Sequence, residues 1–203
     1  MPKIRAENID AHKEQTRAAI LDAAQVVLAR EGYESMRRGD VADLAGVART
    51  TVYSYFATNE ELIVALAEDR AESILASVLD GREHSSGDAI DDILTLVGGC
   101  LEYAAKNADD AALFLSVARS MPNEVTSRIW ELLARIPTEI DRLIGVGVAG
   151  GSIDGENREG LALALGELVM GGVDQLLRVD DPVAALDEIV CSRLAVIRRL
   201  LEG

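Results

Sequence analysis

Aromatic residues make up only 3% of this 203-residue chain, so its core has to be built from aliphatic side chains. Hydrophobic residues still reach 49%, with only four prolines, and such a composition favours helices. No apolar stretch of about 20 residues is free of charge, which argues against a membrane-spanning helix. The polar N-terminus has no apolar signal region. We therefore expect an all-α protein of the cytoplasm that does not enter a membrane.

Two cysteines and two histidines leave little material for metal or redox chemistry. Cys100 and Cys191 have no metal-ligand spacing, which favours buried, reduced thiols over a disulfide. Neither His12 nor His84 follows a Glu at the di-iron spacing, and the chain has no HExxH, no P-loop and no GxGxxG after a strand. We expect no enzyme, no metal and no cofactor. Catalysis by carboxylates alone stays open, because 35 acidic residues make any chosen pair uninformative.

Negative charge dominates the chain, with a net charge of −15, but it is unevenly distributed. Residues 1–57 hold eight basic and eight acidic side chains, whereas residues 58–203 hold 12 basic and 27 acidic ones. An acidic body repels phosphates and orients a basic face on DNA. It also keeps non-specific DNA binding weak and salt-sensitive. This distribution argues against a structural chromosome protein, which would be basic throughout.

Residues 41–56 predict two short helices joined by a tight turn. Ala42 is small enough for a close approach of the two helices, and Gly46 lies where the turn needs a positive φ. We expect these helices at about 38–45 and 49–55. The second one carries polar residues that a buried helix would not choose: Arg49, Thr50, Thr51 and Ser54. A helix with one apolar face and one such polar face is suited to the major groove of DNA.

The flanking segments predict further helices. The first is expected at 11–31, after a mobile arm of about ten residues, with Gly32 as its stop. Its apolar face consists of Ile20, Leu21, Ala24, Val27 and Leu28. Thr58 and Glu61 form a capping box for a fourth helix. Five more are expected at about 88–106, 109–120, 122–148, 156–178 and 182–202, with Asp181 capping the last and Pro137 kinking or breaking the third near Ile136. The total is about nine helices.

Residues 14–62 resemble the N-terminal DNA-binding domain of the TetR (tetracycline repressor) family of transcription regulators. Four short signals occur in the family's order and spacing: Thr16–Ala24, Gly32-Tyr33, Tyr53–Phe56 and Thr58–Leu62. The rest of the chain resembles the family in helical character and length. The resemblance implies an arm and helix-turn-helix domain at 1–57, followed by an effector-binding and dimerisation domain at 58–203.

The resemblance and the residues themselves indicate a DNA-binding face. Arg49 starts the recognition helix, and its guanidinium matches the two acceptors of guanine, so it is the first candidate base reader. Thr50 is the next, and Thr51 suits a thymine methyl or a phosphate. Tyr53 and Tyr55 resemble family positions that contact phosphate or base. The alternative for the tyrosines is that one of them packs under the fourth helix.

Five positions depart from the family pattern, and one of them is Ala48, which replaces a usual Ser or Thr cap. The family often has Ser or Thr where Arg37 stands and an apolar residue at Arg38, so both arginines become candidates for phosphate contact. Gly39 weakens the second helix. Asn59 replaces a common phosphate-binding Lys, and Thr58 or the N–H groups of the fourth helix are candidates to take over that contact.

The last two helices predict a homodimer. Their apolar residues recur at spacings of three and four, and the glycines of the first one, Gly166, Gly171 and Gly172, indicate close helix approach. In the family these two helices pair with their copies in a second subunit, and a two-fold operator needs a two-fold protein. The candidate interface residues are Leu165, Val169, Gly172, Val173, Leu186, Val190, Leu194 and Ile197. The alternative is that they form intrachain core.

The resemblance also implies a pocket for a small-molecule effector in the C-terminal helices. The candidate lining residues are Tyr103, Phe114, Met121, Trp130 and Met170, with ordinary core packing as the alternative for each. The shortage of aromatics favours an apolar effector, and the acidic body a cationic one.

These observations together predict a ligand-responsive repressor. It binds a pseudo-palindromic operator in double-stranded DNA as a dimer and is released by the effector. An activator, or a regulator that acts through a protein partner, is the next alternative. A helical binding protein without a DNA function is the third.

Overall fold

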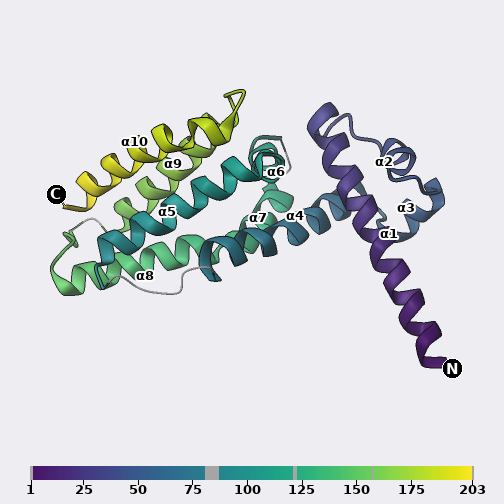
Figure 1. The fold of residues 1–203 in the computed structure, drawn as a ribbon, viewed down its shortest axis with the longest axis horizontal. Coiled ribbons are helices and arrows are strands. Elements are labelled where there is room, and N and C mark those ends of the chain that lie inside the picture. The colour runs from purple at the N-terminus through teal and green to yellow at the C-terminus, as the bar shows by residue number, and fades with distance from the viewer. Residues whose placement is uncertain (1, 81–86, 121–122, 157, 203) are drawn as a thin grey trace. The chain divides into compact units, whose positions relative to one another are not determined.

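The structure, a computed structural model, describes residues 2–80, 87–120, 123–156 and 158–202. Within these ranges the chain is all-α, as predicted, with ten α-helices and one short π-helical segment (Figure 1). The helices are α1 (Pro2–Glu31), α2 (Arg38–Ala45), α3 (Arg49–Tyr55), α4 (Asn59–Leu75), α5 (Ala89–Lys106), α6 (Ala108–Ser120), α7 (Asn123–Leu133), α8 (Arg135–Gly150), α9 (Arg158–Leu176) and α10 (Pro182–Glu202), with the π segment η1 at Ala76–Asp80.

The chain divides into two compact units. The first consists of Met1–Asp69 and Leu113–Ile129, and the second of Arg70–Ala112 and Trp130–Gly203. Helices α1 to α3 belong to the first unit, whereas η1, α5, α8, α9 and α10 belong to the second. Helices α4, α6 and α7 each contribute residues to both.

The first unit is built on one face of α1, as the sequence periodicity predicts. Its five predicted core residues, Ile20, Leu21, Ala24, Val27 and Leu28, are at most 3% exposed. Gly32 ends the helix with a φ of 75°. The expected mobile arm is wrong, because α1 begins at Pro2 and not at residue 11. Proline suits a first-turn position, and no Gly or Pro interrupts residues 3–31, so nothing stops the helix from running this far.

The second unit is organised around α5, which packs against η1, α8, α9 and α10. Asp88 caps α5, its Oδ1 accepting a hydrogen bond of 2.8 Å from the backbone N–H of Ile90. Gly172 of α9 explains how closely α9 and α5 approach, because a Cβ there would lie 2.7 Å from Cδ2 of Leu101. Close packing thus accounts for Gly172. Gly166 has no such neighbour within 4 Å, and nothing in the structure explains it.

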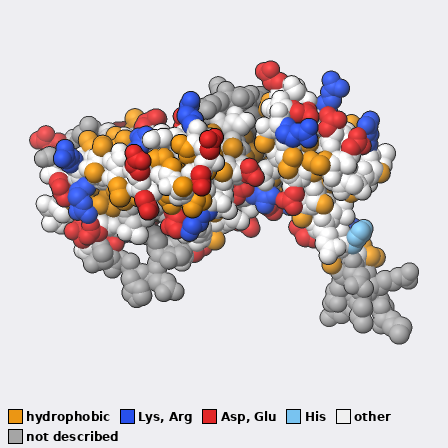
Figure 2. All heavy atoms as spheres, turned by 45° about the horizontal axis from the view of Figure 1, so that its top comes forward, with side chains coloured by type: hydrophobic (Ala, Val, Ile, Leu, Met, Phe, Trp, Pro, Cys, Tyr) orange, Lys and Arg blue, Asp and Glu red, His pale blue; other side chains and the backbone are white. Residues whose placement is uncertain are grey.

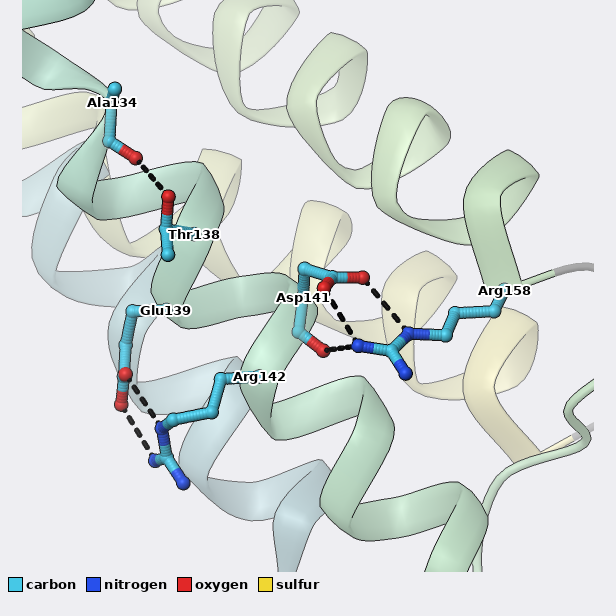
Figure 3. Close-up of polar contacts among 6 residues, drawn as sticks. All are labelled: Ala134, Thr138, Glu139, Asp141, Arg142 and Arg158. Atoms are coloured by element: carbon cyan, nitrogen blue, oxygen red, sulfur yellow. Dashed lines mark hydrogen bonds and ion pairs between the residues drawn. The ribbon is translucent and has the colours of Figure 1, made fainter.

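Pro137 breaks the segment expected as a single helix at 122–148. Helix α7 ends at Leu133 and α8 begins at Arg135, because proline has no N–H to donate to the carbonyl of Leu133. The next residue, Thr138, donates from both its N–H and its Oγ1 to the carbonyl of Ala134, at 3.1 and 2.7 Å. This extra bond secures the first turn of α8 (Figure 3).

A bidentate ion pair joins α8 to the start of α9. Arg158 donates from Nε and Nη2 to the carboxylate of Asp141 at 2.9 and 2.7 Å, and again from Nη2 to the backbone carbonyl of Asp141 (Figure 3). Gly145 leaves room for it, because a Cβ there would lie 3.1 Å from Nη1 of Arg158. Within α8, Arg142 pairs with Glu139 through two hydrogen bonds of 2.8 Å.

Neither cysteine forms a disulfide, but the expectation that both are buried is wrong. Cys100 is half-buried on α5, and Cys191 is exposed on α10, which presents much of its surface to solvent. Across the described residues, no helix is long and apolar enough to cross a membrane.

Candidate nucleic-acid interface

Helices α2 and α3 form the predicted helix-turn-helix with the predicted bounds. Gly46 adopts a φ of 69°, the left-handed conformation that the turn requires, and its N–H bonds to the carbonyl of Ala42. The buried side chains are Val41 and Ala42 on α2 and Val52 on α3, all fully enclosed. Since Val52 is the single buried residue of α3, most of that short helix faces away from the core.

Arg49, the predicted base reader, is exposed at the first turn of α3 and leans over α2. Its Nη2 lies 3.2 Å from Oδ2 of Asp43, and both side chains are about two-thirds exposed. A Cβ on Gly39 would lie 3.4 Å from Cζ and 3.5 Å from Nε of Arg49. The glycine that weakens α2 therefore leaves space for this guanidinium. Sequence reasoning identified neither Gly39 nor Asp43 as a partner of Arg49, because no spacing rule links residues of two different helices.

Arg38 is used within the domain. Its Nη1 donates to the carbonyl of Phe56 at 2.9 Å and to the carbonyl of Ala57, just beyond α3. Its guanidinium also lies over the ring of Tyr53, with Cζ 4.4 Å from the ring centroid. An arginine at this usually apolar position thus ties the end of α3 to the start of α2. The expected phosphate contact would compete with these three interactions.

The two tyrosines of α3 have different surroundings. Tyr53 is 49% exposed, with one ring face covered by Arg38. Tyr55 is half-buried, and its hydroxyl donates to the backbone carbonyl of Lys13 at 3.2 Å. Tyr55 therefore holds α3 against α1. The sequence alternative was that one tyrosine packs under the fourth helix, so the role is local as in that alternative, but the partner is α1. Tyr53 has the accessible surface that a DNA contact needs.

The start of α4 forms the predicted capping box with one change, since the glutamate returns to the residue before the cap. The N–H of Glu61 donates to Oγ1 of Thr58 at 3.1 Å, and Oε2 of Glu61 accepts from the N–H of Ala57 at 2.7 Å. Asn59, where the family commonly has a lysine, donates from Nδ2 to the carbonyl of Met36 at 2.9 Å. With Glu60 and Glu61 in the first turn, carboxylates already complement the helix dipole here. This turn is less suited to a phosphate than the resemblance implies.

A second hydrogen bond ties the start of α4 to the loop after α1. Tyr33 donates its hydroxyl to Oε1 of Glu60 at 2.8 Å. Burial, and then this bond, raise the pKa of Tyr33 to about 12. The pKa of the Glu60 carboxyl is lowered, first by its own backbone N–H and then by Tyr33. Both shifts favour the pair in its bonded form, a neutral phenol beside a carboxylate.

The other predicted DNA contacts are accessible. Arg37 and Thr50 are exposed, and Thr51 is half-buried with its carbonyl accepting from Oγ of Ser54 at 2.7 Å. Among the described residues, the guanidinium of Arg37 forms no hydrogen bond or ion pair. The exposed candidates for DNA contact are therefore Arg37, Arg49, Thr50 and Tyr53. The carboxylate of Asp43 is also exposed on this face.

The predicted dimer residues fall into two groups. Four are buried within the chain, as the intrachain alternative has it: Leu165, Gly172, Val173 and Ile197. Val169 is half-buried, and Leu186, Val190 and Leu194 line a groove of about 1050 Å³ that runs along η1, α5 and α10. Polar residues of this groove include Asp91, Glu102 and Arg198. Arg198 Nη2 lies 2.6 Å from Asp91 Oδ1 and ties α10 to α5.

The predicted effector residues do not gather around that groove. Tyr103, Trp130 and Met170 are half-buried in the second unit, Phe114 is buried in the first, and Met121, like His84, lies outside the described residues. The hydroxyl of Tyr103 donates to Oδ2 of Asp110 at 2.7 Å, and Arg70 Nε lies 3.5 Å from Oδ1 of Asp110. Burial and the bond to Asp110 raise the pKa of Tyr103. No group of three or more metal-ligating side chains occurs in the described part of the chain.

Comparison with known proteins agrees with this geometry. Residues 20–66 match the model of the family described as bacterial regulatory proteins, tetR family. The uncharacterized HTH-type transcriptional regulator YfiR of Bacillus subtilis (strain 168) is 34% identical over 85 residues, which are 42% of this chain and 40% of that relative. The matched stretch is thus well under half of either protein.

Solved structures extend the likeness to most of the chain at the level of fold. FadR from Bacillus subtilis, in complex with stearoyl-CoA, has a TM-score of 0.74 at 20% identity and covers 88% of this chain and 97% of its own. AibR, in complex with isovaleryl coenzyme A and operator DNA, has a TM-score of 0.75 at 12% identity and covers 90% and 97%. The family model covers the helices that form the exposed polar face, and the whole fold is that of such regulators. Residues 20–66 thus match the N-terminal domain of the tetR family of bacterial regulatory proteins, and the fold of the chain is similar to that of FadR and AibR.

Proposed function

We propose that this protein is a ligand-responsive transcriptional repressor that binds a pseudo-palindromic operator as a homodimer and is released by a small molecule. The observation that carries the proposal is the exposed polar face of α3, where Arg49, Thr50 and Tyr53 point away from a core that α3 enters through Val52 alone. A short helix of this kind, presented by a helix-turn-helix, fits the major groove.

The roles on this face follow from chemistry and exposure. Arg49 reads a base pair, since its planar fork matches the N7 and O6 acceptors of guanine. Arg37 neutralises a phosphate and Tyr53 donates to one, which fixes the register without reading sequence. Thr50 and Thr51 contact a thymine methyl or a phosphate. Arg38 and Tyr55 hold α3 in place through their hydrogen bonds within the domain.

Uncovered apolar surface on α9 and α10 supports the homodimer. Leu163 is 70% exposed on α9, and α10 exposes Val183, Val196 and Leu200 at 43–56%. Figure 2 shows the side of this unit on which hydrophobic side chains lie among acidic and basic ones. Large exposed aliphatic residues on two helices that pack side by side are typical of an interaction surface. A second copy of the chain covers this surface in the proposed dimer, with the half-buried Val169 at its edge.

An acyl-bearing or otherwise apolar molecule is the proposed effector. Two proteins of similar fold are bound to acyl thioesters of coenzyme A, and this chain offers an aliphatic interior with few aromatics. The effector acts by binding more tightly to a dimer whose two α3 helices no longer fit successive major grooves, so it shifts the population away from the DNA-bound state. A ligand-responsive activator with the same site is the second candidate.

The test begins with selection of bound sequences from random double-stranded DNA by the purified protein. We expect enrichment of an inverted repeat, with binding that weakens steeply as salt rises. Addition of acyl-CoA of different chain lengths to the selected complex should release the DNA. Failure to enrich any sequence at low salt would contradict operator binding. Enrichment that no acyl-CoA reverses would support operator binding and refute an acyl-CoA effector.

A further inference from the structure

We propose that Gly39 and Asp43 of α2 form a cradle that fixes the guanidinium of Arg49 and makes this arginine a base reader instead of a phosphate binder. The proposal rests on the proposed function, since it concerns the same DNA face. It assigns a positioning role to two residues that contact no base.

The cradle is built from one face of one helix. Gly39 and Asp43 are four residues apart on α2, so both lie on the side that faces Arg49. The guanidinium lies flat over Gly39, with Cζ, Nε and Nη1 at 3.4–3.8 Å from the place where a Cβ would be. Its Nη2 pairs with Oδ2 of Asp43 at 3.2 Å. The room over Gly39 lets the guanidinium lie close to α2, and the bond from one terminal nitrogen to Asp43 restricts its position and rotation.

The charge of Asp43 then determines which group on DNA the positioned guanidinium of Arg49 binds. An unrestrained arginine on a DNA-binding face is drawn to the nearest phosphate, a contact that carries no sequence information. Asp43 is about two-thirds exposed beside Arg49, so its carboxylate repels a phosphate that approaches the pair. A guanine edge carries no net charge and presents two acceptors. The carboxylate therefore disfavours the phosphate more than the guanine.

The ion pair between Arg49 and Asp43 is exposed, so it adds little to the stability of the fold. An exposed ion pair contributes little to folding stability, because water and salt screen it. The contribution of Asp43 is instead the pre-organisation of a long side chain that would otherwise lose rotamer freedom on binding DNA. Removal of the carboxylate should therefore change the binding specificity without unfolding the domain.

The test measures base discrimination by three variants on the operator selected with the wild-type protein. Every base pair of one half-site is substituted in turn, and the affinity of each duplex is measured together with that of random DNA. Substitution of the base pair that Arg49 reads should lower the affinity of the wild type roughly 5- to 150-fold. The same substitution should not change the affinity of Arg49→Ala. Asp43→Asn should cut the discrimination there to a few-fold while its binding to random DNA rises.

Asp40→Asn is the matched control, because it removes the same charge from the same helix. It should strengthen binding to random DNA but keep the full discrimination at the Arg49 pair. Wild-type discrimination in Asp43→Asn would overturn the cradle, and so would an Arg49→Ala profile that changes at no single base pair. Failure of the wild-type protein to select any operator is a different result, which would overturn the proposed function and the cradle with it.

Discussion

Helices α3 and α10 leave different kinds of surface uncovered. The seven residues of α3 bury Val52 alone and expose arginine, threonine and tyrosine groups that can donate hydrogen bonds. The 21 residues of α10 bury three side chains and expose Val183, Val196 and Leu200. Exposed donors suit a charged, hydrated partner such as DNA, whereas exposed aliphatic side chains suit a dry interface. The difference supports the proposal that α3 meets DNA and α10 meets a second copy.

The largest expected effect on operator affinity comes from the exposed aliphatic surface of α9 and α10. Leu163→Glu places a charge in the proposed dimer interface, so we expect monomers and a loss of operator affinity of roughly 100- to 10,000-fold, the gain that linking two binding modules provides. Sedimentation velocity gives the mass, and titration of the operator gives the affinity. Val146→Glu is the control, since Val146 is 50% exposed on α8. A dimeric Leu163→Glu protein would place the interface elsewhere.

The polar side is tested at Arg49. Arg49→Ala should cost about 1–3 kcal/mol of specific binding and change the free energy of unfolding by less than about 0.5 kcal/mol, as is usual for an exposed position. Arg49→Lys keeps the charge but not the planar fork. It should restore binding to random DNA without restoring the preference for one base pair. An equal loss on operator and random DNA in Arg49→Ala would mean that Arg49 binds only phosphate.

Two neighbouring arginines sharpen the comparison within the DNA-binding face. Arg38→Met removes charge-assisted hydrogen bonds to the carbonyls of Phe56 and Ala57, so we expect a loss of about 1.5–3 kcal/mol of stability. Arg37→Met should leave the stability nearly unchanged and reduce the salt slope of DNA binding by about one. Urea unfolding and salt titration of both variants separate the two roles. Equal stability of the two proteins would contradict the structural role of Arg38.

The smallest effect is a pH dependence at the start of α4. The pKa of Tyr33 is about 12 in the folded protein, above the ordinary tyrosine value of 10.0. The folded state therefore holds this proton more tightly, and its contribution to stability is complete below pH 10 and is lost as the pH rises through 12. Tyr33→Phe cannot lose a proton, so its unfolding midpoint in urea should fall less steeply between pH 10 and 12. Parallel curves for the two proteins would refute this linkage.

Local signals explain why the helix-turn-helix could be predicted so closely. Gly46, Val52 and the pair of Thr58 and Glu61 each act within a few residues, through a positive φ, a buried face and a capping box. Pro137 acts in the same local way, by removing one N–H. The start of α1 was missed because polar composition indicates a mobile arm equally well, whereas helix propagation depends on the absence of a breaker.

Side-chain partners were not predictable by the same reasoning. Arg38 and Tyr55 were expected to contact DNA, and Asn59 only to lack the charge of the family's lysine. Their hydrogen bonds go instead to backbone carbonyls 18 to 42 residues away. Exposed and buried faces of α9 and α10 were likewise difficult to separate, because α9 is apolar on nearly every side. Leu165 is fully buried and Leu163 is 70% exposed, although they are only two residues apart. Sequence periodicity does not distinguish a core from an interface when both are apolar.

The empty space at Gly39 sets two selective pressures against each other. Alanine there would strengthen α2 by about 1 kcal/mol, and a larger side chain would also meet the guanidinium of Arg49, whose Cζ lies 3.4 Å from the Cβ position. A directed-evolution screen for heat resistance should therefore replace this glycine early, and survivors with a side chain larger than alanine should lose sequence discrimination while they gain melting temperature. A screen for repression alone should retain glycine. At position 39 the chain thus gives up thermal stability in favour of DNA sequence discrimination.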